Sequence, residues 1–443
     1  MNNCKVPLGH QGTPGPLLCF RFMARVLLGF AAILLGASTA HADDSLTLDQ
    51  AIQLALTRNE RAAISDLQSI QADAAVERAR VAFLPVLNAS GNDTIHPIDT
   101  PKNTAGGSLT LQQPLIVMSA FPLLAQAKHN LDAQRAQTLE DKRQLAFDVA
   151  KAYFGVLLAQ EVVAAAQKKL DTATADVADT DAQFKAQLVS SNDVTRAQIS
   201  LSTSVRELSQ DRSQLATAYI ELGFIINAPA PTTLQAPSAL LDAGKQAPPP
   251  AETLVTQGLA QRQDLLARKD GALAAHDFAR EPRYRYFPTL SLIGQLTATS
   301  NAGMSGHDLD GSIQFAASWS IYDAGARSSD IRSRDAAAAI ADLETKQLVR
   351  SIDSDVRTAV TELTASQQAL AAALDAATAS RKSASETAIL YKQGLAKAIE
   401  LVDANEQRFT AEVSYAEAEF SVASAYLALR QAMGQGPLEE VRK

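Results

Sequence analysis

The chain has 443 residues and a formal net charge of −8, and its two cysteines, Cys4 and Cys19, both lie near the N-terminus. Hydrophobic residues make up 47% of the sequence and aromatic residues only 5%, and alanine supplies most of the difference. This composition favours long, closely packed helices over a thick mixed core. The acidic balance argues against a nucleic-acid partner, and no disulfide can form downstream of Cys19.

The N-terminus has the pattern of a secretory signal peptide. A basic start at Met23-Ala24-Arg25 precedes an apolar run over 26–36, and Ala40-His41-Ala42 matches an A-x-A cleavage site. We predict a signal peptide over residues 1–42, with Met23 as an alternative start. The apolar run is too short to span a bilayer permanently, and no later segment approaches 18 consecutive apolar residues. A membrane protein with this sequence would therefore have to cross as a β-barrel.

The first structural unit is predicted over residues 43–226. Its opening helix runs from Thr47, with Thr47 or Ser45 as N-cap, to about residue 82, and Pro85 ends it. Two strands follow, then a long helix over roughly 119–186 and a returning helix over roughly 193–226. At ~1.5 Å per residue the long helix would be ~100 Å long, and the two shorter helices stacked end to end would match it.

The segment 227–250 is rich in proline and predicts a linker on the surface rather than a helix. After it, residues 251–434 repeat the first unit, with helices over about 251–281, 324–392 and 400–433, and residues 435–443 form a tail. The offset between the copies is nearly constant, since Phe184 corresponds to Tyr391 and Asp193 to Glu400. We interpret this as an internal duplication. Within the second long helix, apolar residues recur at heptad spacing from Ile352 to Ala373, which indicates a coiled-coil seam.

The predicted strands alternate apolar residues with small polar ones, as strands do when they face lipid on one side and a watery lumen on the other. The residues expected on the lipid-facing side of the second pair are Leu290, Leu292, Ile313, Phe315, Ala317, Trp319 and Ile321. A half-buried soluble sheet would need an amphipathic helix to cover it, and none is left over. Four strands cannot close a barrel, so the chain must oligomerise. Two copies would give eight strands and three would give twelve, and the residues alone leave both open.

Several segments resemble the TolC-type outer-membrane efflux family. The stretch 46–56 is similar to the opening helix of that family, and 391–394 followed by 400–404 is similar to its second periplasmic turn. The resemblance covers essentially all of 45–434. It implies a mostly helical fold with a membrane β-barrel portion, in which a homotrimer forms a twelve-stranded barrel on an α-helical barrel. It also implies docking to a periplasmic adaptor (membrane fusion) protein and to an inner-membrane pump or ABC exporter, in efflux or type I secretion.

The resemblance further implies a gate near the helix turns. Asp193 would accept a hydrogen bond from Tyr391, while Glu400 and Asp403 would ring the closed pore. Positions three apart share a helical face, so a trimer would crowd six carboxylates into one constriction. The alternative is that both acids only favour the dipole at a helix N-terminus. Gln187 stands where the family usually has glycine, and Ala396 where some members carry an arginine that locks the mouth.

The same turns would meet the adaptor. The residues expected there are Gln187, Ser190, Ser191, Asn192, Gly394 and Lys397. Their small, polar side chains suit an exposed docking tip and equally suit an ordinary helix turn.

Other classes of protein have less support in the sequence. His96 and His307 lie in inter-strand loops, and His129 and His276 stand alone on helices, so we expect no catalytic site, metal or cofactor. No glycine-rich phosphate loop is present. A soluble periplasmic coiled-coil scaffold is the alternative, but it leaves the alternating strands unexplained. The exported cargo cannot be read from the residues.

Overall fold

The computed structural model describes residues 45–95, 104–231, 233–300 and 308–438. The chain divides into two units, Met1–Ser45 and Leu46–Lys443, and the fold is that of the second. The predicted signal peptide and the loop residues His96 and His307 lie outside the described residues.

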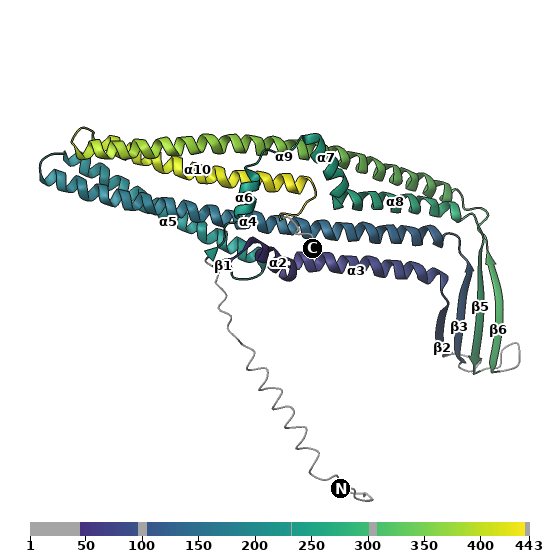
Figure 1. Ribbon diagram of the computed structural model, residues 1–443. Helices are drawn as coiled ribbons and strands as arrows, with labels where there is room; N and C mark the ends of the chain where they lie inside the picture. The colour runs from purple at the N-terminus through teal and green to yellow at the C-terminus, as the bar shows by residue number, and fades with distance from the viewer. Residues whose placement is uncertain (1–44, 96–103, 232, 301–307, 439–443) are drawn as a thin grey trace, which may run out of the picture. The chain divides into compact units, whose positions relative to one another are not determined.

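The first half of the second unit runs from helices into a strand pair and back into helices (Figure 1). After the short strand β1 (Ser45–Leu46), its elements are α2 (Leu48–Arg58), α3 (Glu60–Arg80), the 3₁₀ turn η1 (Val81–Phe83), β2 (Val86–Thr94), β3 (Thr104–Ile116), α4 (Ala120–Lys185) and α5 (Ser191–Ile226). Thr47, not Ser45, is the N-cap of α2, and it forms a capping box with Gln50. The long helix α4 and the returning helix α5 each begin and end within two residues of their expected limits.

The prediction of one continuous opening helix was wrong. It breaks at Asn59, whose backbone is extended and whose side-chain oxygen accepts a hydrogen bond from the Arg61 N–H. The Asn59 Nδ2 also donates to the Ile225 carbonyl in the last turn of α5 at 2.8 Å. Asn59 therefore caps two helix ends at once, since last-turn carbonyls have no partner inside their own helix.

The prediction that 227–250 contains no helix was also wrong. The short strand β4 (Thr233–Leu234) is followed by a seven-residue helix, α6 (Ser238–Gly244), which starts directly after Pro237. Proline suits the start of a helix, where its missing N–H leaves no bond unmade. The buried Leu240 of α6 belongs to the same apolar core as Tyr153 of α4.

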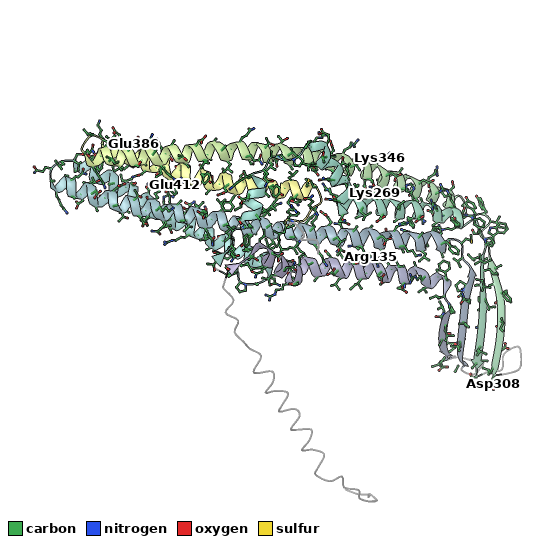
Figure 2. All side chains as sticks on the ribbon, in the orientation of Figure 1. Arg135, Lys269, Asp308, Lys346, Glu386 and Glu412 are labelled. Carbon is green, nitrogen blue, oxygen red and sulfur yellow. The ribbon has the colours of Figure 1, made fainter. Side chains whose placement is uncertain are left out.

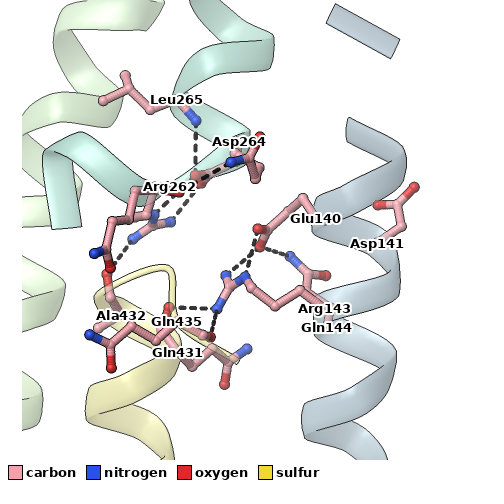
Figure 3. A network of polar contacts seen from close by, with 12 residues as sticks. Glu140, Asp141, Arg143, Gln144, Arg262, Asp264, Leu265, Gln431, Ala432 and Gln435 are labelled. Atoms are coloured by element: carbon pink, nitrogen blue, oxygen red, sulfur yellow. Dashed lines mark hydrogen bonds and ion pairs between the residues drawn. The ribbon is translucent and has the colours of Figure 1, made fainter. Parts of the chain in front are cut away.

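The second half repeats the order of the first. Its elements are α7 (Ala251–Gln261), α8 (Gln263–Tyr284), β5 (Thr289–Thr299), β6 (Leu309–Ser318), α9 (Ala326–Lys392) and α10 (Ala398–Ala432). The first predicted helix again breaks, here at Arg262, which pairs with Asp264 at 2.6 Å and donates to the Ala432 carbonyl at the end of α10. Figure 3 shows this junction, where Arg143 of α4 also donates to the Gln431 carbonyl at 3.0 Å.

The four longer strands form one antiparallel sheet in the order β2-β3-β5-β6. Directly paired residues share a face, so the register sorts the side chains. Leu87, Leu111, Gly294 and Ile313 form one row across the sheet, and the adjacent row, on the other face, is Asn88, Thr110, Gln295 and Ser312. Leu290 pairs with Ala317 and Leu292 with Phe315, on the same face as Ile313.

Two of the residues expected on that face are not in the sheet. β6 ends at Ser318, so Trp319 and Ile321 belong to the connection into α9. Their alternation with polar neighbours continues beyond the last paired residue because an extended connection has the same two-residue period as a strand.

The helices pack in sequence around α4. On the side of the sheet, α3 packs on α4, α4 on α8 and α8 on α9, and toward the helix turns α5 packs on α4, α4 on α10 and α10 on α9. One apolar core contains residues of α2, α4, α5, α6 and α10. A second contains residues of α7, α8, α9 and α10. The second contains Ile352, Val356, Ala359 and Leu363, which confirms the expected heptad seam at these positions.

Among the described helices, α4 alone is long and apolar enough to cross a membrane by composition, with a best 18-residue window of mean hydropathy 1.4. A core helix meets the same criteria. Leu145, Phe147, Val149 and Tyr153 of α4 are fully buried in the first core, and the Tyr153 hydroxyl donates to the Leu46 carbonyl at 2.6 Å. At least this part of α4 therefore lies in the protein interior.

Candidate functional site: the helix turns and the seam between the hairpins

The turns that join α4 to α5 and α9 to α10 have the same backbone conformation. Gln187 and Gly394 both take a left-handed conformation, with φ of 59° and 76°. The following residue in each turn bonds back to its helix, Leu188 N–H to the Gln183 carbonyl and Leu395 N–H to the Leu390 carbonyl, both at 2.9 Å. Gln187 thus adopts the conformation that glycine adopts at no cost, at an expense on the order of 1–2 kcal/mol for a residue with a Cβ.

The residues expected to dock a partner lie on the surface of these turns. Gln187, Ser190, Ser191, Asn192, Gly394 and Lys397 are all exposed. The sequence reasoning missed Leu188 and Leu395, which are 75% and 72% exposed and occupy equivalent positions in the two turns. Their equivalence was visible in the constant offset between the copies. An exposed leucine at each tip adds an apolar contact to an otherwise polar surface.

The expected bond between Asp193 and Tyr391 does not occur within the chain. Asp193 is the third residue of α5 and accepts hydrogen bonds from the Ser190 N–H at 3.0 Å and the Ser190 hydroxyl at 2.8 Å. The buried Tyr391 hydroxyl instead lies 3.2 Å from the Thr180 hydroxyl oxygen on α4. The local capping box uses the carboxylate that the resemblance assigned to the tyrosine.

Glu400 and Asp403 are both exposed near the start of α10. Glu400 is the third residue of that helix, and its carboxylate lies 3.4 Å from the Lys397 N–H, which it caps. Within one chain the geometry of Glu400 fits a capping role, while Asp403 remains on the surface. A pore role for the pair would arise only between copies of the chain.

Near the turns, four polar contacts join α4 to the second hairpin, and we call them the polar ladder. Lys169 Nζ lies 2.6 Å from Glu406, Thr172 accepts from Arg408 at 3.2 Å, Asp176 accepts from Asn405 at 2.9 Å, and Thr180 meets Tyr391. The four α4 residues are three or four positions apart and so lie along one helix face. Their spacing was visible in the sequence, but their partners, more than 200 positions away, were not.

Lys169 is the most heavily engaged member of the polar ladder. Its side chain is only 9% exposed, and its ammonium also lies 2.7 Å from Glu207 on α5 and 4.5 Å from the ring centre of Phe409. Lys169 therefore ties three helices together. Burial lowers the pKa of Lys169, but the hydrogen bonds to Glu207 and Glu406 outweigh it and hold the pKa above its ordinary value. The group remains charged through the neutral range.

Asp176 is the member of the polar ladder whose charged form is disfavoured by burial. Burial raises its pKa above the ordinary carboxyl value, although the hydrogen bond from Asn405 works in the opposite direction. The hydrogen bond from Asn405 therefore helps to stabilise the ionised carboxylate of Asp176, and this stabilisation is lost if Asn405 moves away.

Beyond the polar ladder the same seam has an apolar stretch, before Lys151 and Arg143 of α4 meet Gln431 at the end of α10. Phe154 of α4 and Phe420 of α10 have ring centres 6.1 Å apart, and Ala423 and Leu427 of α10 are buried in the core with Phe154. The two hairpins are thus joined by an apolar contact near their middle and by hydrogen bonds and ion pairs toward the turns. Polar contacts exchange with water more readily than an apolar core does, so the contacts near the turns cost less to separate than the apolar stretch.

The described part of the chain offers no arrangement suited to binding a metal ion. It holds no group of three or more His, Cys, Asp or Glu side chains suited to a metal ion. His129 pairs with Asp277 at 3.6 Å and His276 with Asp342 at 3.0 Å, and each pair joins α8 to a neighbouring helix. These histidines act as links between helices.

Long helical hairpins attached to a sheet with one apolar face are typical of a membrane channel protein. The family model of the outer membrane efflux protein matches residues 51–228 and again 254–435. The chain belongs to the outer membrane efflux protein family. It is an outer-membrane efflux channel.

Similar proteins agree over most of the length. The chain is 23% identical to the outer membrane protein TolC of Vibrio cholerae over 373 residues, covering 81% of this chain and 84% of TolC. It is 23% identical to the outer membrane efflux protein BepC of Brucella suis over 414 residues, covering 91% of this chain and 89% of BepC. The solved open state of the Neisseria gonorrhoeae MtrE outer membrane channel superposes on this chain with a TM-score of 0.76 at 20% sequence identity. The superposition covers 89% of this chain and 91% of MtrE.

Proposed function

We propose that the protein is a passive homotrimeric conduit of a tripartite system. The observation that carries this proposal is that its two lateral edges differ. One edge consists of β2, α3 and α5, and the other of β6 and α9. Both edges expose apolar residues, among them Ile64, Leu67, Ile70 and Phe224 on the first and Ile340, Leu343, Leu374 and Ile389 on the second.

Unlike edges favour a closed ring. A two-fold dimer joins identical surfaces, whereas an edge that meets its complement on the next copy gives head-to-tail association, which closes after a fixed number of copies. In lipid the ring must close, because an open strand edge leaves unpaired N–H and carbonyl groups. Three copies would give twelve strands, with β6 of each copy beside β2 of the next, and an α-helical barrel below.

The internal duplication fits the same proposal. The order of helices and strands occurs twice, and the family model matches twice. We propose units over residues 43–226 and 251–434, a linker over 227–250, a tail over 435–443 and a signal peptide over 1–42. Each unit supplies one strand pair to the barrel and one hairpin to the helical part.

We assign partner docking to the two turns. One tip holds Gln187, Ser190, Ser191 and Asn192 around Leu188, and the other holds Gly394 and Lys397 around Leu395. Both tips would meet a periplasmic adaptor that links the channel to an inner-membrane pump or ABC exporter. Matching apolar side chains at equivalent positions would present six similar tips in a trimer, as a repeating partner surface requires.

A cysteine pair across the edges tests the ring. Ile70 and Ile340 are both exposed, and their neighbours Ala72 and Ala341 line one concavity of the helical part, which places them at a similar height. With the variant Ile70→Cys/Ile340→Cys, a short bismaleimide should give covalent dimers and trimers and no larger product on a denaturing gel. Each single variant is the control and should stay monomeric. A product that stops at two chains, or none from the double variant, would contradict the trimer.

The gate has its own test. If three copies bring Glu400 and Asp403 together, like charges crowd where water is limited, and multivalent cations should bind and block the closed channel. Glu400→Ala/Asp403→Ala should weaken that block by at least about tenfold and reduce cation selectivity in planar bilayers, without loss of the oligomer. Glu362→Ala/Asp375→Ala, which removes two exposed acids of α9 farther from the turn, is the matched control. Unchanged block would assign Glu400 to capping alone.

A further inference from the structure

Exposed aromatic residues gather where the sheet joins the helices. Tyr286, Phe287 and Trp319 are all exposed, and Trp319, the single tryptophan of the chain, is held by a hydrogen bond from its Nε1 to the Tyr286 carbonyl at 2.9 Å. On the other strand pair, Phe83 and Phe121 have ring centres 5.0 Å apart. Tryptophan and tyrosine at such a level are typical of residues at the boundary between the hydrocarbon core and the lipid headgroups.

The adjoining helix ends are basic in an otherwise acidic chain. Residues 76–85, 119–130, 277–288 and 323–335 hold nine Lys or Arg and six Asp or Glu, against 40 and 48 in the whole chain. Three of the cations, Arg78, Lys128 and Arg332, are exposed and form no ion pair with any residue that the structure describes. We call these three cations and the aromatic residues Tyr286, Phe287 and Trp319 the basic–aromatic belt.

Structural roles inside the chain account for other arginines but not for all of the belt. Arg327 is buried, pairs with Asp323 at 2.6 Å and lies over the Tyr286 ring, so it orders the connection from β6 to α9. Arg78, in the last turn of α3, also complements that helix dipole. Arg332 is in the second turn of α9, where it gains nothing from the helix dipole, and no ion pair with a described residue accounts for it.

We propose that the basic–aromatic belt binds the anionic headgroups of phospholipids in the periplasmic leaflet of the outer membrane. The inference rests on the proposed insertion of the sheet into the outer membrane. It adds the class of lipid that binds where the sheet joins the helices. The aromatic rings lie at headgroup depth, and the cations one to three helix turns beyond them meet the phosphate groups. A cation near a surface of anionic lipid gains attraction that salt screens.

Trp319 provides a reporter at the site itself. The purified full-length protein is reconstituted in vesicles of equal parts phosphatidylcholine and phosphatidylglycerol, with bromine on the acyl chains of one lipid or of the other. Brominated phosphatidylglycerol should quench Trp319 fluorescence more strongly, with an enrichment of roughly fivefold at low ionic strength that declines at high salt. Arg78→Gln/Lys128→Gln/Arg332→Gln should remove the preference.

A charge-matched control uses cations farther from the sheet. Lys269→Gln/Lys346→Gln/Arg350→Gln removes three exposed charges from α8 and α9 and should keep the preference. Lys269 and Lys346 lie away from the sheet (Figure 2), and Arg350 is one helix turn beyond Lys346 in α9. Equal quenching by the two brominated lipids in the unmodified protein would overturn the inference while leaving the proposed insertion intact. If neither lipid quenches Trp319, the rim of the sheet is not at the membrane, and the proposed function itself fails.

Discussion

Arginine at Ile313 should abolish accumulation of the protein in the outer membrane, whereas arginine at the adjacent Ser312 should have little effect. The two residues lie on opposite faces of β6. Ile313, which is 79% exposed in the single chain, continues a row formed by Leu87, Leu111 and Gly294, while Ser312 continues a row of polar residues. An arginine facing lipid near the membrane midplane costs about 2–4 kcal/mol, and one facing a watery lumen costs far less.

The measurement is the amount of heat-modifiable oligomer extracted from the outer membrane by detergent. Ile313→Ser and Ser312→Ala are the controls for loss of the original side chains, and both should accumulate nearly normally. Equal yields of Ile313→Arg and Ser312→Arg would show that the apolar face is not turned toward lipid. A severe defect only in Ser312→Arg would assign the faces the other way round.

The sequence predicted the long elements well because local signals define them. Thr47, one of the two expected N-caps, does cap α2, and the heptad residues from Ile352 to Leu363 are buried. The alternation in β5 and β6 placed Leu292 and Phe315 on one face before any register was known. Each of these features depends on residues within one or two turns, or within one strand, of each other.

Features that depend on distant partners were not predicted. The helix breaks at Asn59 and Arg262 satisfy carbonyls at Ile225 and Ala432, and nothing near either residue indicates a break except its polarity. Tyr391 meets Thr180 because α4 carries Thr180 to it across 211 positions, while Asp193 is already used by its own helix start. The pairing of Asp193 with Tyr391 that the family resemblance implied is therefore not made within the chain.

The closed arrangement of the two hairpins should depend most strongly on Lys169. Lys169→Met keeps most of the length of the side chain, but it leaves Glu207 and Glu406 facing each other without a cation. Breaking an ion pair costs little at the surface and about 3–5 kcal/mol when both partners are buried. Because Glu406 is half exposed, we expect an intermediate loss of about 2 kcal/mol in the contact between hairpins.

That loss should appear as a higher open probability and a higher resting conductance in planar bilayers, with the oligomer intact. Lys168→Met is the matched control, since Lys168 is exposed and adjacent, and Lys169→Arg should retain closure. Adding Glu406→Gln to Lys169→Met should recover part of the closed state by removing the uncompensated charge, and a double-mutant cycle measures that coupling. If Lys169→Met and Lys168→Met conduct alike, the apolar contact around Phe154 and Phe420 holds the hairpins together without help from the polar ladder.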